Sequence, residues 1–181
     1  MNSLLGLIYS CYFSLRYHRR LFSCRFANIP NIKSRNFKTS VEFFAGRDFY
    51  VRGNKYSKIF IDTKVLFGPD VMLLAGNHVT NHTQSHLYDY NLHDDRSKDI
   101  VVNKGAWVGA RSILLSGAEI GEGSIVGCNS VVNAKLKPYC IYAGTPAKLI
   151  SPRFTKSELC EILQTTGSEL SISNIPFKDA N

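Results

Sequence analysis

The feature that most constrains this fold is an aliphatic residue that recurs every six positions in the second half of the chain. The series runs Val102, Val108, Leu114, Ile120, Val126 and Val132. An amphipathic helix needs apolar residues three and four positions apart, and a half-buried strand alternates every second residue. A period of six matches neither pattern. It indicates a repeating coil in which each repeat contributes one short strand and one corner.

The positions beside this series also favour a coil. The residue that follows is Gly or Asn in five of the six repeats, and the residue two before is small in five of six. Such residues let the backbone turn tightly at corners. A weaker upstream set keeps the same spacing and comprises Phe43, Phe49, Ile61, Phe67 and Leu73. We therefore predict an all-β domain over residues 37–152.

The repeat is interrupted between Gly76 and Lys98, where the sequence is polar and aperiodic. Long excursions from a compact domain are usually functional, so we predict an extended catalytic loop over residues 76–99. The loop contains His78, His82 and His86. Histidine titrates near neutral pH and is the most common general base. A histidine trio also leaves open a metal site.

Charge is unevenly distributed along the chain. The net charge is +8, and residues 1–40 contain seven Lys and Arg but no Asp or Glu. Because these cations lie among aromatic and aliphatic residues, residues 1–36 are interpreted as a basic amphipathic segment with a short helix that contacts a membrane surface, not nucleic acid. The alternative is a helix that packs on a neighbouring subunit or on the open end of the domain.

The cysteines bear on the compartment. There are five, an odd number at irregular spacing without a Cys-x-x-Cys pair. This usage indicates reduced thiols in a cytoplasmic protein, peripheral at the inner face of the membrane if the N-terminal segment binds lipid.

The C-terminal segment, residues 153–181, is expected to form a helix and a tail. Thr155-Lys156-Ser157-Glu158 has the form of a capping box, which predicts a helix over residues 156–165 that ends near Gly167. The tail beyond it lacks periodicity. We expect the tail to be mobile or to pack only on a partner.

Several motifs resemble one known family, the hexapeptide-repeat acyltransferases, and in particular its maltose, galactoside and nodulation-type sugar O-acetyltransferases. The motifs are Phe67-Gly68-Pro69-Asp70-Val71, Gly76-Asn77-His78, Ala106-Trp107-Val108-Gly109-Ala110 and Tyr142-Ala143-Gly144-Thr145-Pro146-Ala147-Lys148. The resemblance covers roughly residues 60–152. It implies a left-handed parallel β-helix, a homotrimer, and acetyl-CoA bound in the groove between neighbouring subunits.

The same resemblance implies roles for individual residues on the acceptor side. His78 matches the catalytic base, and Asn77 and Trp107 match positions at the acceptor site. Asn54 is the candidate for an asparagine that often helps to hold the acceptor hydroxyl.

The resemblance also implies which residues contact the cofactor. The backbone at Ala110 and Cys128 is expected to contact the pantetheine arm of acetyl-CoA. Asn133, Ala134 and Lys148 are expected near its nucleotide end. Ala134 replaces a basic residue often found there, which leaves Lys135 or Lys137 as substitutes for phosphate contact.

The chemistry of acetyl transfer agrees with this assignment. A sugar hydroxyl is a poor nucleophile until a base takes its proton, and the tetrahedral intermediate needs N–H donors, for which the corner around Gly109 and Ala110 is a candidate. We predict O-acetylation of a sugar, nucleotide-linked or lipid-linked, in surface polysaccharide or lipopolysaccharide biosynthesis, without a metal. The alternatives are N-acetylation of an amino sugar and a metal-dependent, carbonic anhydrase-like enzyme that uses His78, His82 and His86.

Overall fold

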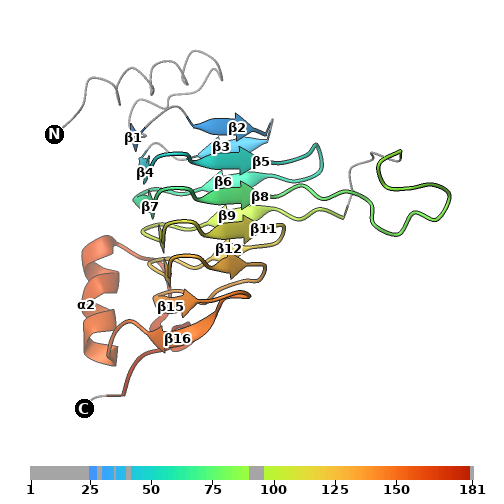
Figure 1. The fold of residues 1–181 in the computed structure, drawn as a ribbon. Helices are drawn as coiled ribbons and strands as arrows, with labels where there is room; N and C mark the ends of the chain where they lie inside the picture. The colour runs from blue at the N-terminus through green and yellow to red at the C-terminus, as the bar shows by residue number, and fades with distance from the viewer. Residues whose placement is uncertain (1–24, 28–29, 35, 40–41, 90–95, 180–181) are drawn as a thin grey trace.

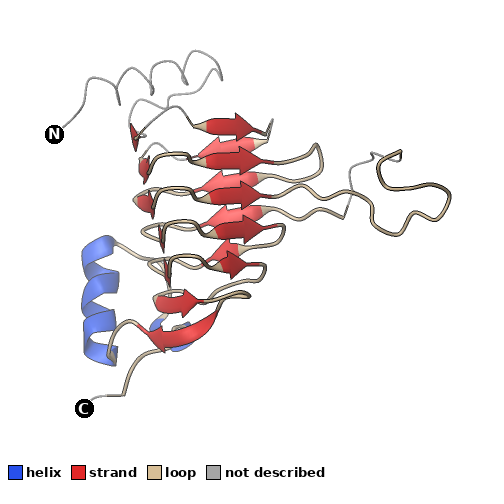
Figure 2. Ribbon diagram, in the orientation of Figure 1, coloured by secondary structure: helices blue, strands red, loops and turns tan. Residues whose placement is uncertain are grey.

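The computed structural model describes residues 25–179, apart from residues 28–29, 35, 40–41 and 90–95. Short strands wind into a stack of coils, and one α-helix lies along the stack (Figures 1 and 2). The fold is a left-handed parallel β-helix, as predicted. The expected N-terminal helix and its membrane contact fall on residues 1–24, outside the described part of the chain. No helix within the described residues is long and apolar enough to cross a membrane.

Three sheets form the faces of the stack, and they are called sheets A, B and C here. Sheet A contains, in spatial order, β1 (Arg25–Phe26), β4 (Phe43–Ala45), β7 (Val65–Phe67), β10 (Trp107–Val108), β13 (Ile125–Val126), β15 (Cys140–Ala143) and β16 (Lys148–Pro152). Sheet B contains β14 (Val131–Val132), β11 (Ile113–Leu115), β8 (Met72–Leu74), β5 (Tyr50–Arg52) and β2 (Asn31–Lys33). Sheet C contains β12 (Glu119–Ile120), β9 (Ile100–Val102), β6 (Ile59–Ile61) and β3 (Phe37–Thr39). The chain visits A, B and C in turn, which defines A/B, B/C and C/A corners.

The six-residue series fills the inside of the coil. All six aliphatic residues are at most 1% exposed, as are the upstream Ile61, Phe67 and Leu73. The small residues two positions earlier also face inward. Ser112 and Ser124 are fully buried, and their hydroxyls donate to the carbonyls of Gly127 (2.9 Å) and Lys137 (2.7 Å) in the next coil. Where the small residue is one of these serines, its hydroxyl therefore joins successive coils inside the corner.

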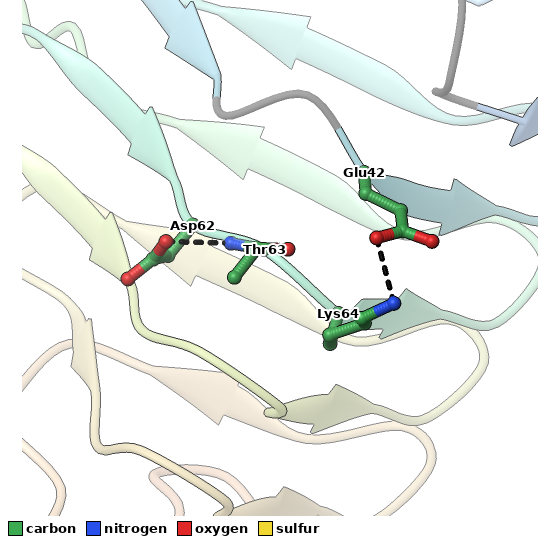
Figure 3. A network of polar contacts seen from close by, with 4 residues as sticks. All are labelled: Glu42, Asp62, Thr63 and Lys64. Carbon is green, nitrogen blue, oxygen red and sulfur yellow. Dashed lines mark hydrogen bonds and ion pairs between the residues drawn. The ribbon is translucent and has the colours of Figure 1, made fainter. Parts of the chain in front are cut away.

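Ion pairs link successive coils on the outside of the corners. At the C/A corner, Lys64 Nζ lies 2.6 Å from Glu42 Oε2, while the neighbouring Asp62 accepts a hydrogen bond from the backbone N–H of Thr63 (Figure 3). Each side chain of this ion pair is more than half exposed, so the pair adds little stability. It nevertheless places opposite charges, Lys64 and Glu42, next to each other on successive coils.

The coil begins earlier than the sequence boundary at residue 37. β1 pairs with β4 and β2 pairs with β5, and Phe26 and Ile32 are buried. The Phe26 ring meets Phe43 edge-on, with centroids 5.3 Å apart. Part of the expected basic segment, residues 1–36, therefore belongs to the β-helix, because its apolar residues extend the inner column.

The C-terminal helix is confirmed. α2 (Lys156–Thr166) begins with a capping box in which Thr155 and Glu158 bond reciprocally, and it ends at Gly167 in the left-handed conformation with φ of 59°. The expectation of a mobile tail is wrong for the described residues. After a 3-10 turn, η1 (Ile172–Asn174), Ile175 is buried with Leu159, and Lys178 N–H donates to Phe154 O at 2.7 Å.

Candidate active site

The expected loop leaves the coil at the B/C corner, between β8 and β9. In Figure 1 it is the long green segment that projects away from the stack, and α2 lies on the opposite side. His78 and Asn77 are at its root, four and three residues beyond the end of β8, and both are exposed. Sheet B holds β8 before the loop, and sheet C holds β9 after it. His78 is therefore exposed to solvent close to strands whose positions are fixed.

A buried amide holds the root of this loop. Asn54, 6% exposed, donates from Nδ2 to Ser97 Oγ at 2.9 Å and to Asn77 O at 3.5 Å. Ser97 Oγ also accepts the backbone N–H of Asn77 at 3.1 Å. The two ends of the excursion are therefore tied to each other and to the corner of the preceding coil, directly beside His78.

This geometry gives Asn54 a structural role in the loop root. Its Oδ1 accepts the backbone N–H groups of Tyr56 (2.9 Å) and Ser57 (3.1 Å), so both ends of the amide are engaged inside the protein. The side chain therefore holds the loop root, and its contact with an acceptor hydroxyl stays a prediction. Ser97 was missed by the sequence analysis, because nothing in a polar loop distinguishes one serine from another.

The predicted pantetheine contacts lie together at the A/B corner. Ala110 and Cys128 occupy successive coils, and the backbone N–H of Asn129 donates to Ala110 O at 2.9 Å. Glycines allow this close stacking. A Cβ on Gly68 would lie 2.6 Å from Ala110 N, and one on Gly109 would lie 2.7 Å from Cys128 N. Cys128 is exposed and Ala110 is half-buried, so this narrow corner is open to a ligand.

One oxyanion candidate is excluded at this corner. The backbone N–H of Gly109 donates to Val126 O at 2.8 Å as part of the coil ladder. The Ala110 N–H remains the candidate donor.

The residues expected at the nucleotide end are exposed near the last coil. Asn133 and Ala134 follow β14, and Lys148 begins β16. Ala147, next to Lys148, donates its N–H to Val131 O in β14 at 2.8 Å, which brings the two segments together. Of the two proposed substitutes for the missing basic residue, Lys135 forms an ion pair with Glu119 at 2.7 Å.

Trp107 projects outward from sheet A and is 46% exposed. In register beside it are Leu66 of β7 and Ile125 of β13. Trp107 begins β10, just after the C/A corner, whereas His78 leaves the B/C corner. Within one chain these two residues therefore stand at different corners.

His78 and the Ala110–Cys128 corner are also separated within one chain. The A/B corner precedes the first residues of β11 and β14 in sheet B, while His78 follows the last residue of β8, the strand that pairs with β11. A single subunit thus places the candidate base and the predicted pantetheine contacts at opposite ends of the parallel strands of sheet B.

The remaining cysteine, arginine and histidine candidates each contact other protein groups. Burial raises the pKa of the Cys140 thiol, and this residue is 0% exposed, which fits a core role. Arg153 donates to the Gly123 carbonyl and lies 4.7 Å from the Phe154 ring centroid; burial lowers the pKa of its guanidinium.

The loop histidines bear on the metal alternative. His82 Nε2 lies 3.0 Å from Ser85 Oγ. Within the described residues, no three His, Cys, Asp or Glu side chains are arranged to hold a metal ion.

The sequence is similar to several known acetyltransferases. A family model described as bacterial transferase hexapeptide (six repeats) matches residues 99–134. The chain is 25% identical over 179 residues to a chloramphenicol acetyltransferase of Klebsiella aerogenes, covering 84% of this chain and 82% of that protein. It is 28% identical over 135 residues to the putative lipopolysaccharide biosynthesis O-acetyl transferase WbbJ of Escherichia coli K12, covering 69% and 67%. Matches to further chloramphenicol acetyltransferases span only about a third of those proteins.

A solved structure shows the same fold. The polySia specific acetyltransferase NeuO superposes with a TM-score of 0.57 at 21% identity, covering 80% of this chain and 73% of that one. The repeat, the three-sided coil and the matched proteins define a left-handed β-helix protein of the hexapeptide-repeat class. Within that class, the relatives that the chain matches are acetyltransferases.

Proposed function

We propose that this acyltransferase uses acetyl-CoA to acetylate a hydroxyl group of a sugar, with His78 as the general base. The observation that carries the proposal is the position of His78. It is an exposed imidazole at the root of a loop whose two ends are tied by Asn54 and Ser97. A base held on a fixed frame and open to solvent is suited to take a proton from a bound alcohol.

The reaction balances with this base alone. His78 takes the hydroxyl proton as the acceptor oxygen attacks the thioester carbonyl, and a tetrahedral intermediate forms. The Ala110 N–H is suited to stabilise its oxyanion. Collapse of the intermediate breaks the C–S bond, and the leaving thiolate of CoA receives the proton from the imidazolium. The ester and the free thiol are the products.

The separation of His78 from the A/B corner favours an active site shared between subunits. In a homotrimer, the loop of one subunit would meet the Ala110–Cys128 corner of its neighbour. Acetyl-CoA would then lie in the intervening groove, with its nucleotide end near Asn133, Ala134 and Lys148. Trp107 and the exposed side chain of Asn77 would border the acceptor.

The relatives favour two classes of acceptor. WbbJ is named for lipopolysaccharide biosynthesis, and a further relative of Escherichia coli K12, 26% identical over 113 residues, is a galactoside O-acetyltransferase. These names support a sugar of a surface polysaccharide or lipopolysaccharide, nucleotide-linked or lipid-linked. The chloramphenicol acetyltransferases support a second candidate, a hydroxyl-bearing antibiotic.

The test is thiol release from acetyl-CoA with a panel of sugars, nucleotide-sugars, amino sugars and chloramphenicol. Wild type, His78→Ala and the nearby exposed Thr80→Ala are compared, and metal content is measured on the same preparations. Acceptor-dependent turnover that is retained in Thr80→Ala and lost in His78→Ala is expected. Equal turnover in wild type and His78→Ala, or hydration activity that requires a bound metal, would overturn the proposal.

A further inference from the structure

We infer that the acceptor carries an anionic group, and that this group binds at a basic corner formed by Lys33, Arg52 and Lys55. The inference rests on the proposed function and specifies its substrate class. These three residues lie where sheet B meets the B/C corner, in the two coils that precede the root of the His78 loop.

The charge of the chain is concentrated in these first coils. The described residues within 25–60 include seven Lys and Arg but only two Asp and Glu. The coils therefore form a strongly cationic end, next to a remainder in which the two signs nearly balance. A field of one sign beside a reactive group attracts ligands of the opposite sign.

The register of the strands places like charges side by side. Lys33 of β2 pairs with Arg52 of β5, and both side chains are exposed. Like charges directly opposite each other on neighbouring strands are destabilising. At other positions where ionic side chains meet between successive coils, the charges are complementary, as in Lys64–Glu42, Arg111–Asp70 and Lys135–Glu119.

Protection of a sheet edge does not explain the pair. A lysine on an edge strand discourages pairing with another chain, which would account for Lys33, because β2 is the last strand of sheet B. β5, however, is an interior strand, and Arg52 needs another reason. Among the described residues, no carboxylate forms an ion pair with either cation.

The adjoining turn is held rigidly beside the catalytic loop. Asn36 Nδ2 donates to Lys55 O at 3.2 Å and to Ser57 O at 3.3 Å from the coil above. Within the turn itself, Asn54 donates to Ser97 and to Asn77, the residue before His78, in the coil below. The backbone carrying Lys55 is thus fixed relative to the general base, and less entropy is lost when a ligand binds there.

The turn also presents an aromatic surface. The Tyr56 side chain is 43% exposed, and Lys55 Nζ lies 4.8 Å from the centroid of its ring. A ring next to cations matches a sugar that carries a negative charge, since the ring can contact the apolar C–H groups of the sugar. The neighbouring Lys58 is less suited to this role, because Asp99 Oδ1 accepts its backbone N–H at 2.7 Å and brings a carboxylate close.

Phosphate and carboxylate share the chemistry that this corner recognises, and the acceptor panel separates them. A UDP-linked hexose, a glucuronic acid glycoside and a neutral methyl hexoside are compared as acceptors. The variants are the double variant Arg52→Gln/Lys55→Gln and the control Lys156→Gln, an exposed cation at the start of α2. Each kinetic constant is measured for the acceptor and for acetyl-CoA separately.

The expected result is a KM for the anionic acceptor about tenfold higher in the double variant, with the KM for acetyl-CoA, the neutral acceptor and the control unchanged. The preferred anion identifies phosphate or carboxylate. An equal effect on the neutral acceptor, or no effect, would overturn the inference. A raised KM for acetyl-CoA would also overturn it, because the cations would then serve the phosphates of CoA.

Failure of the proposed function is distinguishable from failure of this inference. If wild type acetylates none of the acceptors, the proposed function fails. Calorimetric binding of the UDP-linked hexose and the glucuronic acid glycoside, without acetyl-CoA, then decides the inference by itself. Binding that is lost in the double variant and retained in Lys156→Gln supports the basic corner, and binding that is absent or equal in both overturns it.

Discussion

Asn54 Nδ2 donates a hydrogen bond to Ser97 Oγ at 2.9 Å, joining two corners that are 43 residues apart in the chain. Ser97 precedes β9 by three residues, and Asn54 follows β5 by two. The bond therefore closes the long excursion at its root and holds the segment that carries His78.

Replacement of this amide is expected to lower activity through the loop. Asn54→Ala removes the acceptor of the Tyr56 and Ser57 N–H groups and one donor to the Ser97 hydroxyl, which should reduce the free energy of unfolding by about 2 kcal/mol. Release of the loop root displaces His78, and kcat should fall by about tenfold to a hundredfold. The KM for acetyl-CoA should remain unchanged, because the A/B corner is untouched.

Asn103→Ala is the matched control for Asn54→Ala. Asn103 Nδ2 donates to Ile120 O at 2.8 Å in the same fold, away from the loop. Its loss should cost about 1 kcal/mol of stability and leave kcat unchanged. Chemical unfolding and steady-state kinetics measure both effects. If the two variants lose kcat in proportion to their stability, Asn54 has no positioning role.

The fold was predictable because a short repeat encodes it. A residue that points inward once every six positions leaves a visible period, and Val108, Leu114 and Ile120 carry it without interruption. The start of the coil was less visible, since Phe26 and Ile32 are six residues apart but fall one position out of register with Phe43, and they lie in a basic segment. The packing of the tail was missed because Ile175 and Lys178 make single contacts that have no period.

The site was predictable only in part, for a related reason. His78 and Trp107 lie in motifs with a fixed distance from the repeat, so the resemblance locates them. The network of Asn54 and Ser97 depends on how many residues each corner inserts, and a sequence does not state which insertions become neighbours. The same limitation concealed the Lys33–Arg52 pair, which only the register between β2 and β5 reveals.

Glycines at the A/B corner allow a graded prediction. In Gly109→Ala the new Cβ would lie 2.7 Å from Cys128 N and 2.8 Å from Val126 O, both backbone atoms that cannot move alone. In Gly127→Ala the nearest atom is the Ala143 Cβ at 3.0 Å. Gly109→Ala should therefore reduce stability by about 2–3 kcal/mol and Gly127→Ala by less.

The two variants should also differ in cofactor binding. The new Cβ of Gly109→Ala presses directly on the backbone N of Cys128, whereas that of Gly127→Ala first meets the Ala143 Cβ, so the Kd for CoA should rise more in Gly109→Ala at a temperature where both are folded. Thermal unfolding and calorimetric titration with CoA test the order. A Gly127→Ala variant that is the less stable of the two would contradict the assigned close approach.

Buried thiol and phenol groups in and beside β15 are expected to make the stability of the protein sensitive to alkaline pH. Burial raises the pKa of the Cys140 thiol above its ordinary 9.0, and burial likewise raises the pKa of the Tyr139 and Tyr142 phenols above 10.0. The folded protein favours the protonated, neutral forms of these groups. Their contribution is fully present below the ordinary values and is lost as the pH rises through the raised folded values. The free energy of unfolding should thus decline above about pH 9.

A phenylalanine variant isolates one of these groups. The Tyr142 hydroxyl accepts the backbone N–H of Lys137 at 2.9 Å, so Tyr142→Phe should lower stability at neutral pH by about 1 kcal/mol. Because the variant has lost one titrating group, its decline above pH 9 should be shallower than in wild type. Tyr88→Phe, at a side chain that is 94% exposed, should leave both the level and the slope unchanged. Urea unfolding at closely spaced pH values measures the slopes, and parallel curves for wild type and Tyr142→Phe would show that burial of this phenol is not coupled to folding.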